Sequence, residues 1–138
     1  TQNIKEPFLH YVHSANVIGR INIDLLIKQY FDSIRVKCIP SLIEEYKKKS
    51  AHISNVNTAA QIPECQALIK LGILSIPYIV DDMELGTGTD WHHILATITG
   101  DNPISEEIAG RIPEMTVRWH KFLHAKYATY LKTFRKEN

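Results

Sequence analysis

Seven histidines are the residues of this chain that most directly suggest metal chemistry. His120 and His124 stand four residues apart in the segment HKFLH, and this spacing places two imidazoles on one face of an α-helix. A zinc protease would need a glutamate directly after the first histidine, where this chain has Lys121. The sequence places no third ligand beside the pair. We therefore expect exposed or partly packed histidines and no metal site.

Three pairs of adjacent carboxylates are the candidates for general acid–base catalysis. The pairs are Glu44-Glu45, Asp81-Asp82 and Glu106-Glu107. The first two fall at matching positions of two similar segments, which favours a solvated helix face over an active site. No nucleophile elbow, oxyanion loop or phosphate-binding motif accompanies the remaining Ser, His, Asp and Cys residues. We expect no enzymatic activity, no catalytic residues and no cofactor.

The composition is that of an ordinary globular protein. A chain of 138 residues with 44% apolar and 22% charged residues fits one domain, residues 1–138, with a core of its own. A net charge of +1 argues against a dedicated nucleic-acid binder, and no apolar run approaches the roughly 20 residues that cross a bilayer. Cys38 and Cys65 lack any CxxC spacing, so we expect two buried thiols, with a disulfide or a metal pair as the alternatives.

A repeated pattern indicates the fold. The segment CIPSLIEEY (38–46) aligns with SIPYIVDDM (75–83) at a shift of 37 residues, and a third Ile-Pro pair begins at Ile112, 36 residues after Ile76. In the first two copies the apolar residues follow the 3–4 spacing of one buried helix stripe. A fixed period near 37 predicts stacked helical repeats. The expected units cover residues 21–50, 58–86 and 90–136.

Each unit is expected to contain a pair of helices. Each second helix begins at an Ile-Pro pair, because proline is favoured in the first turn of a helix. Gly72 and Gly100 follow two of the first helices, where left-handed C-terminal caps are expected. After Pro113 the apolar spacing continues to the chain end, which predicts one long capping helix. The expected first helices cover residues 23–34, 62–71 and 91–99.

The remaining segments are less regular. Residues 50–57 are interpreted as a loop between units. Residues 1–20 are ambiguous, with a short helix expected around Phe8 to His13. Trp91 and Trp119 lie on the apolar stripes of their helices and are expected to anchor the core.

The chain resembles the HEAT-like repeats of bacterial proteins. The resemblance is carried by ALIKLGILSIPYIVDDMELG (67–86), by WHHILATITGDNP (91–103) and by the terminal helix segment RWHKF (118–122). It implies an all-α fold, a right-handed α-solenoid of about three helix pairs whose second helices line a concave face. Such repeats occur mostly as scaffolds and binding surfaces, so the resemblance implies no particular activity.

These observations favour a module that binds a protein or peptide through the outward row of its second helices. This row is acidic in the first two units and basic in the last, which suits a partner with a basic segment. The expected contact residues are Glu44, Glu45, Tyr78, Asp81, Asp82 and Arg118.

Two alternatives stay open. A helical-repeat DNA glycosylase would need a strongly positive groove, against which the acidic row argues. A purely structural module without a ligand of its own is the other alternative.

Overall fold

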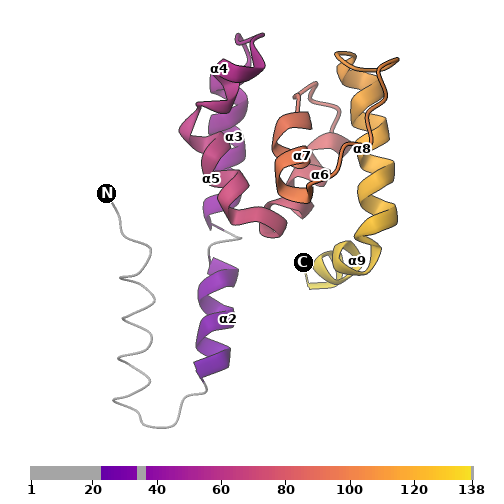
Figure 1. Cartoon of the computed structure of the whole chain (residues 1–138). Helices are drawn as coiled ribbons and strands as arrows, with labels where there is room; N and C mark the ends of the chain where they lie inside the picture. The colour runs from indigo at the N-terminus through magenta and orange to yellow at the C-terminus, as the bar shows by residue number, and fades with distance from the viewer. Residues whose placement is uncertain (1–22, 34–36, 138) are drawn as a thin grey trace. The chain divides into compact units, whose positions relative to one another are not determined.

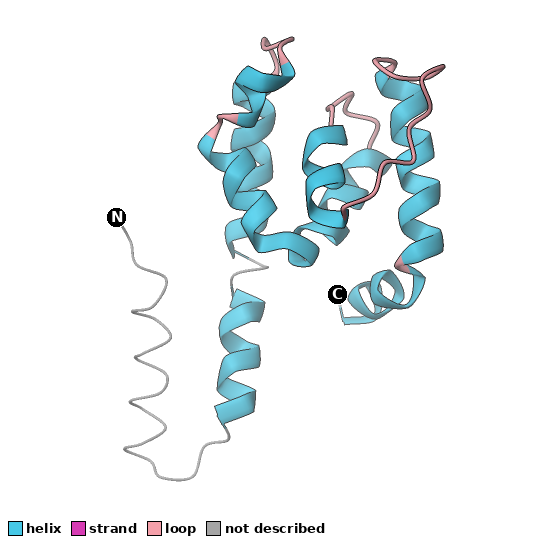
Figure 2. Cartoon of the chain, viewed as in Figure 1, coloured by secondary structure: helices cyan, strands magenta, loops and turns pink. Residues whose placement is uncertain are grey.

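The described part of the chain consists of helices and the loops that connect them. The computed structural model describes residues 23–33 and 37–137 (Figure 1). Within these ranges there is no strand (Figure 2), so the predicted all-α class is confirmed. Among the described helices, none has the length and apolar character of a bilayer-crossing segment. The short helix expected around Phe8 to His13 lies outside the described residues.

The described helices extend from Ile23 to Glu137. In order they are α2 (Ile23–Ser33), α3 (Ile39–Ser50), α4 (Val56–Ala60), α5 (Pro63–Leu71), the 3-10 turn η2 (Gly72–Ser75), α6 (Ile76–Glu84), α7 (His92–Thr99), α8 (Ile112–Lys126) and α9 (Ala128–Glu137). The chain divides into two compact units between Pro40 and Ser41, within α3. The first expected helix pair is therefore shared between the two units, and each unit is described by itself.

All three Ile-Pro pairs open α-helices, as the repeat predicted. Ile39, Ile76 and Ile112 are the first residues of α3, α6 and α8, and each is followed by its proline. Ile39 and Ile76 are wholly buried, whereas Ile112 is half-buried. The three predicted first helices are also present, as α2, α5 and α7. The right-handed solenoid arrangement of these pairs stays a prediction.

Both glycines follow their helices as expected, but only Gly100 forms the left-handed cap. Gly100 has φ 73° and ψ 9°, the left-handed conformation that glycine adopts without the Cβ penalty of other residues. Gly72 also has a positive φ, 59°, but its ψ of −129° leads directly into η2. The loop expected at residues 50–57 is shorter, because α4 begins at Val56. Asn55 caps this helix by accepting hydrogen bonds from the backbone N–H groups of Asn57 and Thr58.

The predicted single C-terminal helix is wrong. Tyr127, with φ −115° and ψ 30°, interrupts it and separates α8 from α9. Figure 1 shows α9 turned away from the axis of α8. The turn lets Leu131 and Phe134 become buried, and Tyr130 donates a hydrogen bond to the carbonyl oxygen of Ile73 over 3.1 Å. A straight helix would carry this apolar stripe past the domain, so burial of the stripe favours the bend.

The core of the second unit surrounds two tryptophans, as predicted. Trp91 and Trp119 are 3% and 1% exposed, and α7 packs against both α5 and α8. The indole N–H of Trp119 donates to Nδ1 of His92 over 3.0 Å, so the buried polar atom of this ring has a partner.

The two cysteines differ in exposure. Cys65 is buried, but Cys38 is exposed, which contradicts the expectation of two buried thiols. Both are free thiols. Burial raises the pKa of the Cys65 thiol.

Candidate functional site

The predicted second-helix row is only partly a charged surface. Glu44 is exposed and Glu45 partly so, but their Oε1 atoms lie 3.4 Å and 3.5 Å from the ammonium groups of Lys47 and Lys48. Asp81 is also exposed. The lysines offset the negative charge of α3, so the acidic row is weaker than the sequence indicated.

Tyr78 is not a freely exposed aromatic residue of this row, because α9 partly covers it. Its ring is half-buried and packs edge-on against Phe134 of α9, with centroids 5.1 Å apart. The bend at Tyr127 brings α9 back over this part of α6. The sequence could not reveal this contact, because a single straight C-terminal helix would leave Tyr78 uncovered.

Asp82 is not on the surface, which corrects the prediction that it belongs to the outward row. Its side chain is 5% exposed. Oδ1 accepts a hydrogen bond from Nζ of Lys47 over 2.7 Å. Oδ2 accepts from Oγ1 of Thr87 over 2.8 Å and from the indole N–H of Trp91 over 2.9 Å. A buried carboxylate needs such partners, and Asp82 uses them to join α3, α6 and the start of α7.

The environment of Asp82 keeps it ionised. Burial raises the pKa of this carboxyl, but hydrogen bonds from Lys47, Thr87 and Trp91 and the lysine charge outweigh burial, so the net pKa is lowered. The hydrogen bond to Asp82 likewise raises the pKa of Lys47. The pair is therefore charged throughout the neutral pH range.

Tyr46 completes this buried cluster. Its ring packs against Trp91 with centroids 5.3 Å apart, and its hydroxyl donates to the carbonyl oxygen of Asp90 over 3.4 Å. Burial, with smaller contributions from Cys65 and Asp90, raises the pKa of Tyr46 to about 12. The buried part of the cluster, Tyr46, Asp82 and Trp91, ties α3 and α6 to the start of α7.

A hollow on the outer side of α8 is the best-formed concave surface near a predicted contact residue. It measures about 440 Å³ and is lined by Ile108, Pro113, Glu114, Val117 and Arg118. Val117 is 70% exposed despite its apolar side chain. The guanidinium of Arg118 donates to the carbonyl oxygen of Pro103 over 3.5 Å, which links the helix to the loop that precedes it. We call this surface the α8 groove.

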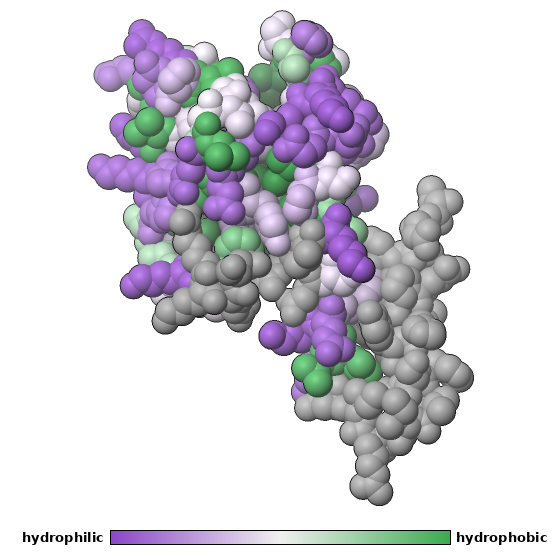
Figure 3. All heavy atoms as spheres, turned by 180° about the vertical axis from the view of Figure 1, so that it is seen from behind, coloured by the Kyte–Doolittle hydropathy of each residue, from purple (hydrophilic) through white to green (hydrophobic). Residues whose placement is uncertain are grey.

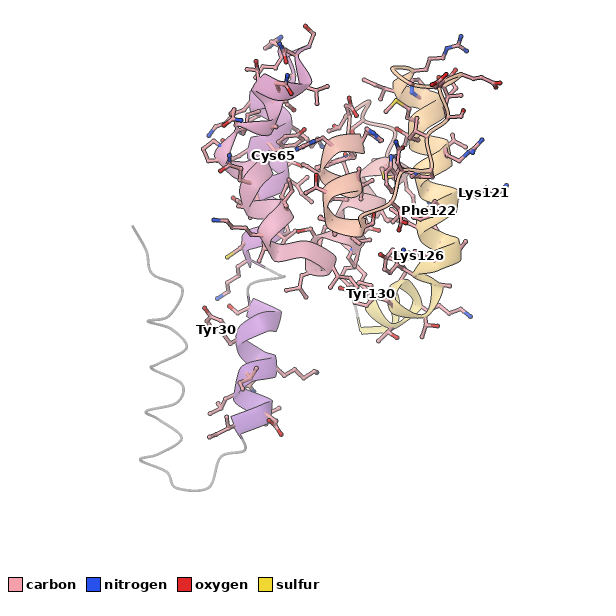
Figure 4. All side chains as sticks on the ribbon, in the orientation of Figure 1. Tyr30, Cys65, Lys121, Phe122, Lys126 and Tyr130 are labelled. Atoms are coloured by element: carbon pink, nitrogen blue, oxygen red, sulfur yellow. The ribbon has the colours of Figure 1, made fainter. Side chains whose placement is uncertain are left out.

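Two views place this surface in the molecule. Figure 4 shows Lys121 on the outer side of α8, whereas Phe122 lies on the side facing α7. In Figure 3 apolar residues reach the surface as small patches separated by polar ones, as is normal for a folded domain.

A second cluster of polar side chains lies where α6 meets α8. Glu84 is the last residue of α6, and its Oε2 lies 2.8 Å from Nε2 of His120 and 3.5 Å from Nε2 of His124. The three side chains can each offer one donor atom to a common cation. The sequence predicted that the two histidines share one helix face, but it did not identify a third ligand.

The spacing of the repeat could have identified Glu84 as the third side chain of this cluster. Glu84 and His120 are 36 residues apart, which is also the shift between the Ile-Pro pairs of α6 and α8. They therefore occupy equivalent positions on successive second helices. Equivalent positions of packed neighbouring helices face the same way and are separated by about 8 to 10 Å between axes. Two long side chains can bridge that distance.

Comparisons of the chain with the profiles of known protein families, with curated proteins and with solved structures find no match. The HEAT-like resemblance therefore depends on the residues of this chain alone.

Proposed function

We propose that this chain is a protein- or peptide-binding module of HEAT-like helix pairs that docks its partner in the α8 groove. The observation that carries the proposal is the groove itself, an exposed hollow of about 440 Å³ with an apolar floor and one charge of each sign, Arg118 and Glu114, beside it. Ligand-binding hollows in proteins measure roughly 300 to 1,000 Å³. Arg118, one of the predicted contact residues, lines it.

The lining indicates the chemistry of the partner. Ile108, Pro113 and Val117 offer apolar contact, and the exposed Arg118 offers a fork of donors that suits a carboxylate. A short peptide segment with an apolar side chain next to an aspartate or glutamate fits this surface best. The proposed partner thus carries an acidic segment, whereas the sequence had favoured a basic one. The change follows from the burial of Asp82 and from the lysines beside Glu44 and Glu45.

The glycosylase alternative gains no support from the charges of these surfaces. The α8 groove carries one charge of each sign, Glu114 and Arg118, rather than the positive lining that DNA requires. If no partner binds, the remaining alternative is a purely structural module without a ligand of its own.

Selection of peptides from a random displayed library against the whole chain tests the proposal. We expect selected peptides to combine an apolar and an acidic residue, and to bind Val117→Glu and Arg118→Glu variants at least tenfold more weakly than the parent. Both residues are exposed, so the free energy of unfolding should change by less than about 0.5 kcal/mol.

A double variant, Glu44→Lys with Glu45→Lys, is the matched control on the other predicted surface. Binding that is unchanged there supports the α8 groove. Peptides that are basic and that lose affinity only in this control would instead assign docking to the acidic row. Failure to select any peptide that binds more tightly than about 1 mM would reject the peptide-binding function.

A further inference from the structure

The junction between α6 and α8 brings together three side chains that the proposed function does not use. His120 and His124 lie one helical turn apart on α8, with ring centroids separated by 4.3 Å. Their spacing along the helix sets this proximity, because residues four apart share one face. Glu84 reaches the same point from α6, which packs directly on α8. Nitrogen and oxygen donors from two helices thus converge on one small region.

One nitrogen atom in this cluster lacks a hydrogen-bond partner. Nε2 of His124 is buried, and it forms no hydrogen bond with any of the described residues. The oxygen of Glu84 that lies 3.5 Å away instead forms its hydrogen bond with His120, over 2.8 Å. Buried polar atoms in folded proteins nearly always have a partner, and each exception calls for an explanation. A cation between the three side chains would supply the partner that Nε2 of His124 lacks.

The distances suit a zinc-sized ion. Zinc binds histidine nitrogen and carboxylate oxygen at about 2.0 to 2.2 Å in a tetrahedral arrangement, which separates neighbouring donor atoms by roughly 3.3 Å. The two distances from Oε2 of Glu84, 2.8 Å and 3.5 Å, lie on either side of that value. Small side-chain rotations would therefore open the site without moving either helix.

We propose that Glu84, His120 and His124 form a site for a divalent transition metal, with zinc as the ion that fits best. Two imidazoles and one carboxylate are donors that zinc prefers, whereas calcium and magnesium prefer oxygen ligands throughout. The site shares no residue with the lining of the α8 groove and does not depend on the peptide-binding proposal. It revises the expectation of no metal site, which depended on the lack of a third ligand.

Three protein ligands leave a fourth position for water. All three side chains are more than a third exposed, so the position is open to solvent. Lys121 follows His120 where a zinc protease would have its general base, so the proposal is one of metal binding and not of peptide hydrolysis. A bound ion would join α6 to α8 across 36 to 40 residues of chain.

The test is a titration of the whole chain, without an affinity tag, with Zn²⁺ and separately with Co²⁺. Calorimetry should give one Zn²⁺ per chain, and Co²⁺ should develop the visible absorption of a four-coordinate ion. Glu84→Gln, His120→Gln and His124→Gln should each weaken Zn²⁺ binding at least tenfold. Zn²⁺ should raise the Tm of the parent by several degrees at a hundredfold excess over Kd, and should not do so in the three variants.

Matched controls separate this site from nonspecific binding. His52→Gln removes an exposed histidine elsewhere, and Cys38→Ser removes the exposed thiol, so neither should change Zn²⁺ affinity. Ring ¹H–¹⁵N spectra of the parent provide a readout that needs no variant. Among the histidines, the signals of His120 and His124 should shift on addition of Zn²⁺.

Four results would overturn the proposal. The first is no binding at 100 μM Zn²⁺, and the second is binding that the three variants leave unchanged. The third is a shift of other histidine signals with those of His120 and His124 unaffected. A stoichiometry of one ion for two chains would also reject the site as described, because it would require a ligand from a second copy.

Discussion

Replacing Asp82 with alanine should destabilise the domain by about 3 to 5 kcal/mol. Removing one member of a buried ion pair costs about that much, since the other charge is left without its partner. Here Lys47 keeps 21% of its side chain exposed, and Glu44 lies 3.4 Å away, so part of the cost is relieved. The indole N–H of Trp91 has no such relief, and a buried donor without an acceptor costs a further 1 to 3 kcal/mol. Chemical denaturation followed by circular dichroism measures the change.

Asparagine at the same position should cost less, about 2 kcal/mol. Its carbonyl oxygen can still accept from Thr87 and Trp91, but its amide group then faces the ammonium of Lys47. Glu45→Gln is the matched control, because it removes a charge from an exposed pair and should cost less than about 1 kcal/mol. A double-mutant cycle of Asp82→Asn with Lys47→Met should give a coupling of about 1 to 3 kcal/mol.

The stabilisation by Asp82 should also depend on pH. The pKa of this carboxyl is lower in the folded state than in the unfolded chain, where the aspartate pKa is about 3.9. Its contribution is therefore present above that pH and is lost as the pH falls through the lower folded value. Parent and Asp82→Asn should begin to converge in stability below about pH 4 and should converge fully only below the lowered folded pKa. An Asp82→Ala variant that costs less than about 1 kcal/mol at pH 7 would refute the buried network.

Three further substitutions test the fold. Trp119→Ala should cost about 3 to 5 kcal/mol, since the ring is 1% exposed, and a loss below about 1 kcal/mol in denaturation would show that the ring is not packed. Gly100→Ala should cost about 1 to 2 kcal/mol from backbone strain alone, because φ is 73° and no described atom lies within 4 Å of an added Cβ. An unchanged Tm would contradict the left-handed cap. A thiol reagent should modify Cys38 rapidly in the folded chain and Cys65 only after unfolding, because the latter is 1% exposed and burial raises its pKa. Cys38→Ser should remove the fast phase, and a fast phase that persists would mean that Cys65 is accessible.

The helix boundaries were largely predictable because local chemistry sets them. Proline after isoleucine marks the start of α3, α6 and α8, and glycine with positive φ ends α5 and α7. The bend at Tyr127 was not predictable, because it depends on what α9 covers after the turn. The short helix α4 was missed as well, although Asn55 is a recognisable N-cap residue within the segment interpreted as a loop.

The candidate sites were less predictable, since they depend on contacts between helices. Asp81 and Asp82 look alike in the sequence, yet one is exposed and the other is buried against Lys47 and Trp91. Helical spacing predicted the pairing of His120 with His124, a contact within one helix. Glu84 required comparison of equivalent positions in two repeats. The site predictions that failed are those that treated each helix as an isolated amphipathic element.

The settings of the two tryptophans give the chain a pair of independent optical reporters. Trp91 can receive excitation energy from the ring of Tyr46, 5.3 Å away on α3, so its emission responds when α3 separates from the rest of the second unit. The indole N–H of Trp119 is hydrogen-bonded to the imidazole of His92, so the emission of Trp119 responds when α8 separates from α7. Because these are the only indoles in the chain, replacing either one with phenylalanine isolates the signal of the other. Coincident unfolding curves from the two variants would show that both ends of the second unit melt as one cooperative block, and separate curves would resolve the order in which the helices detach.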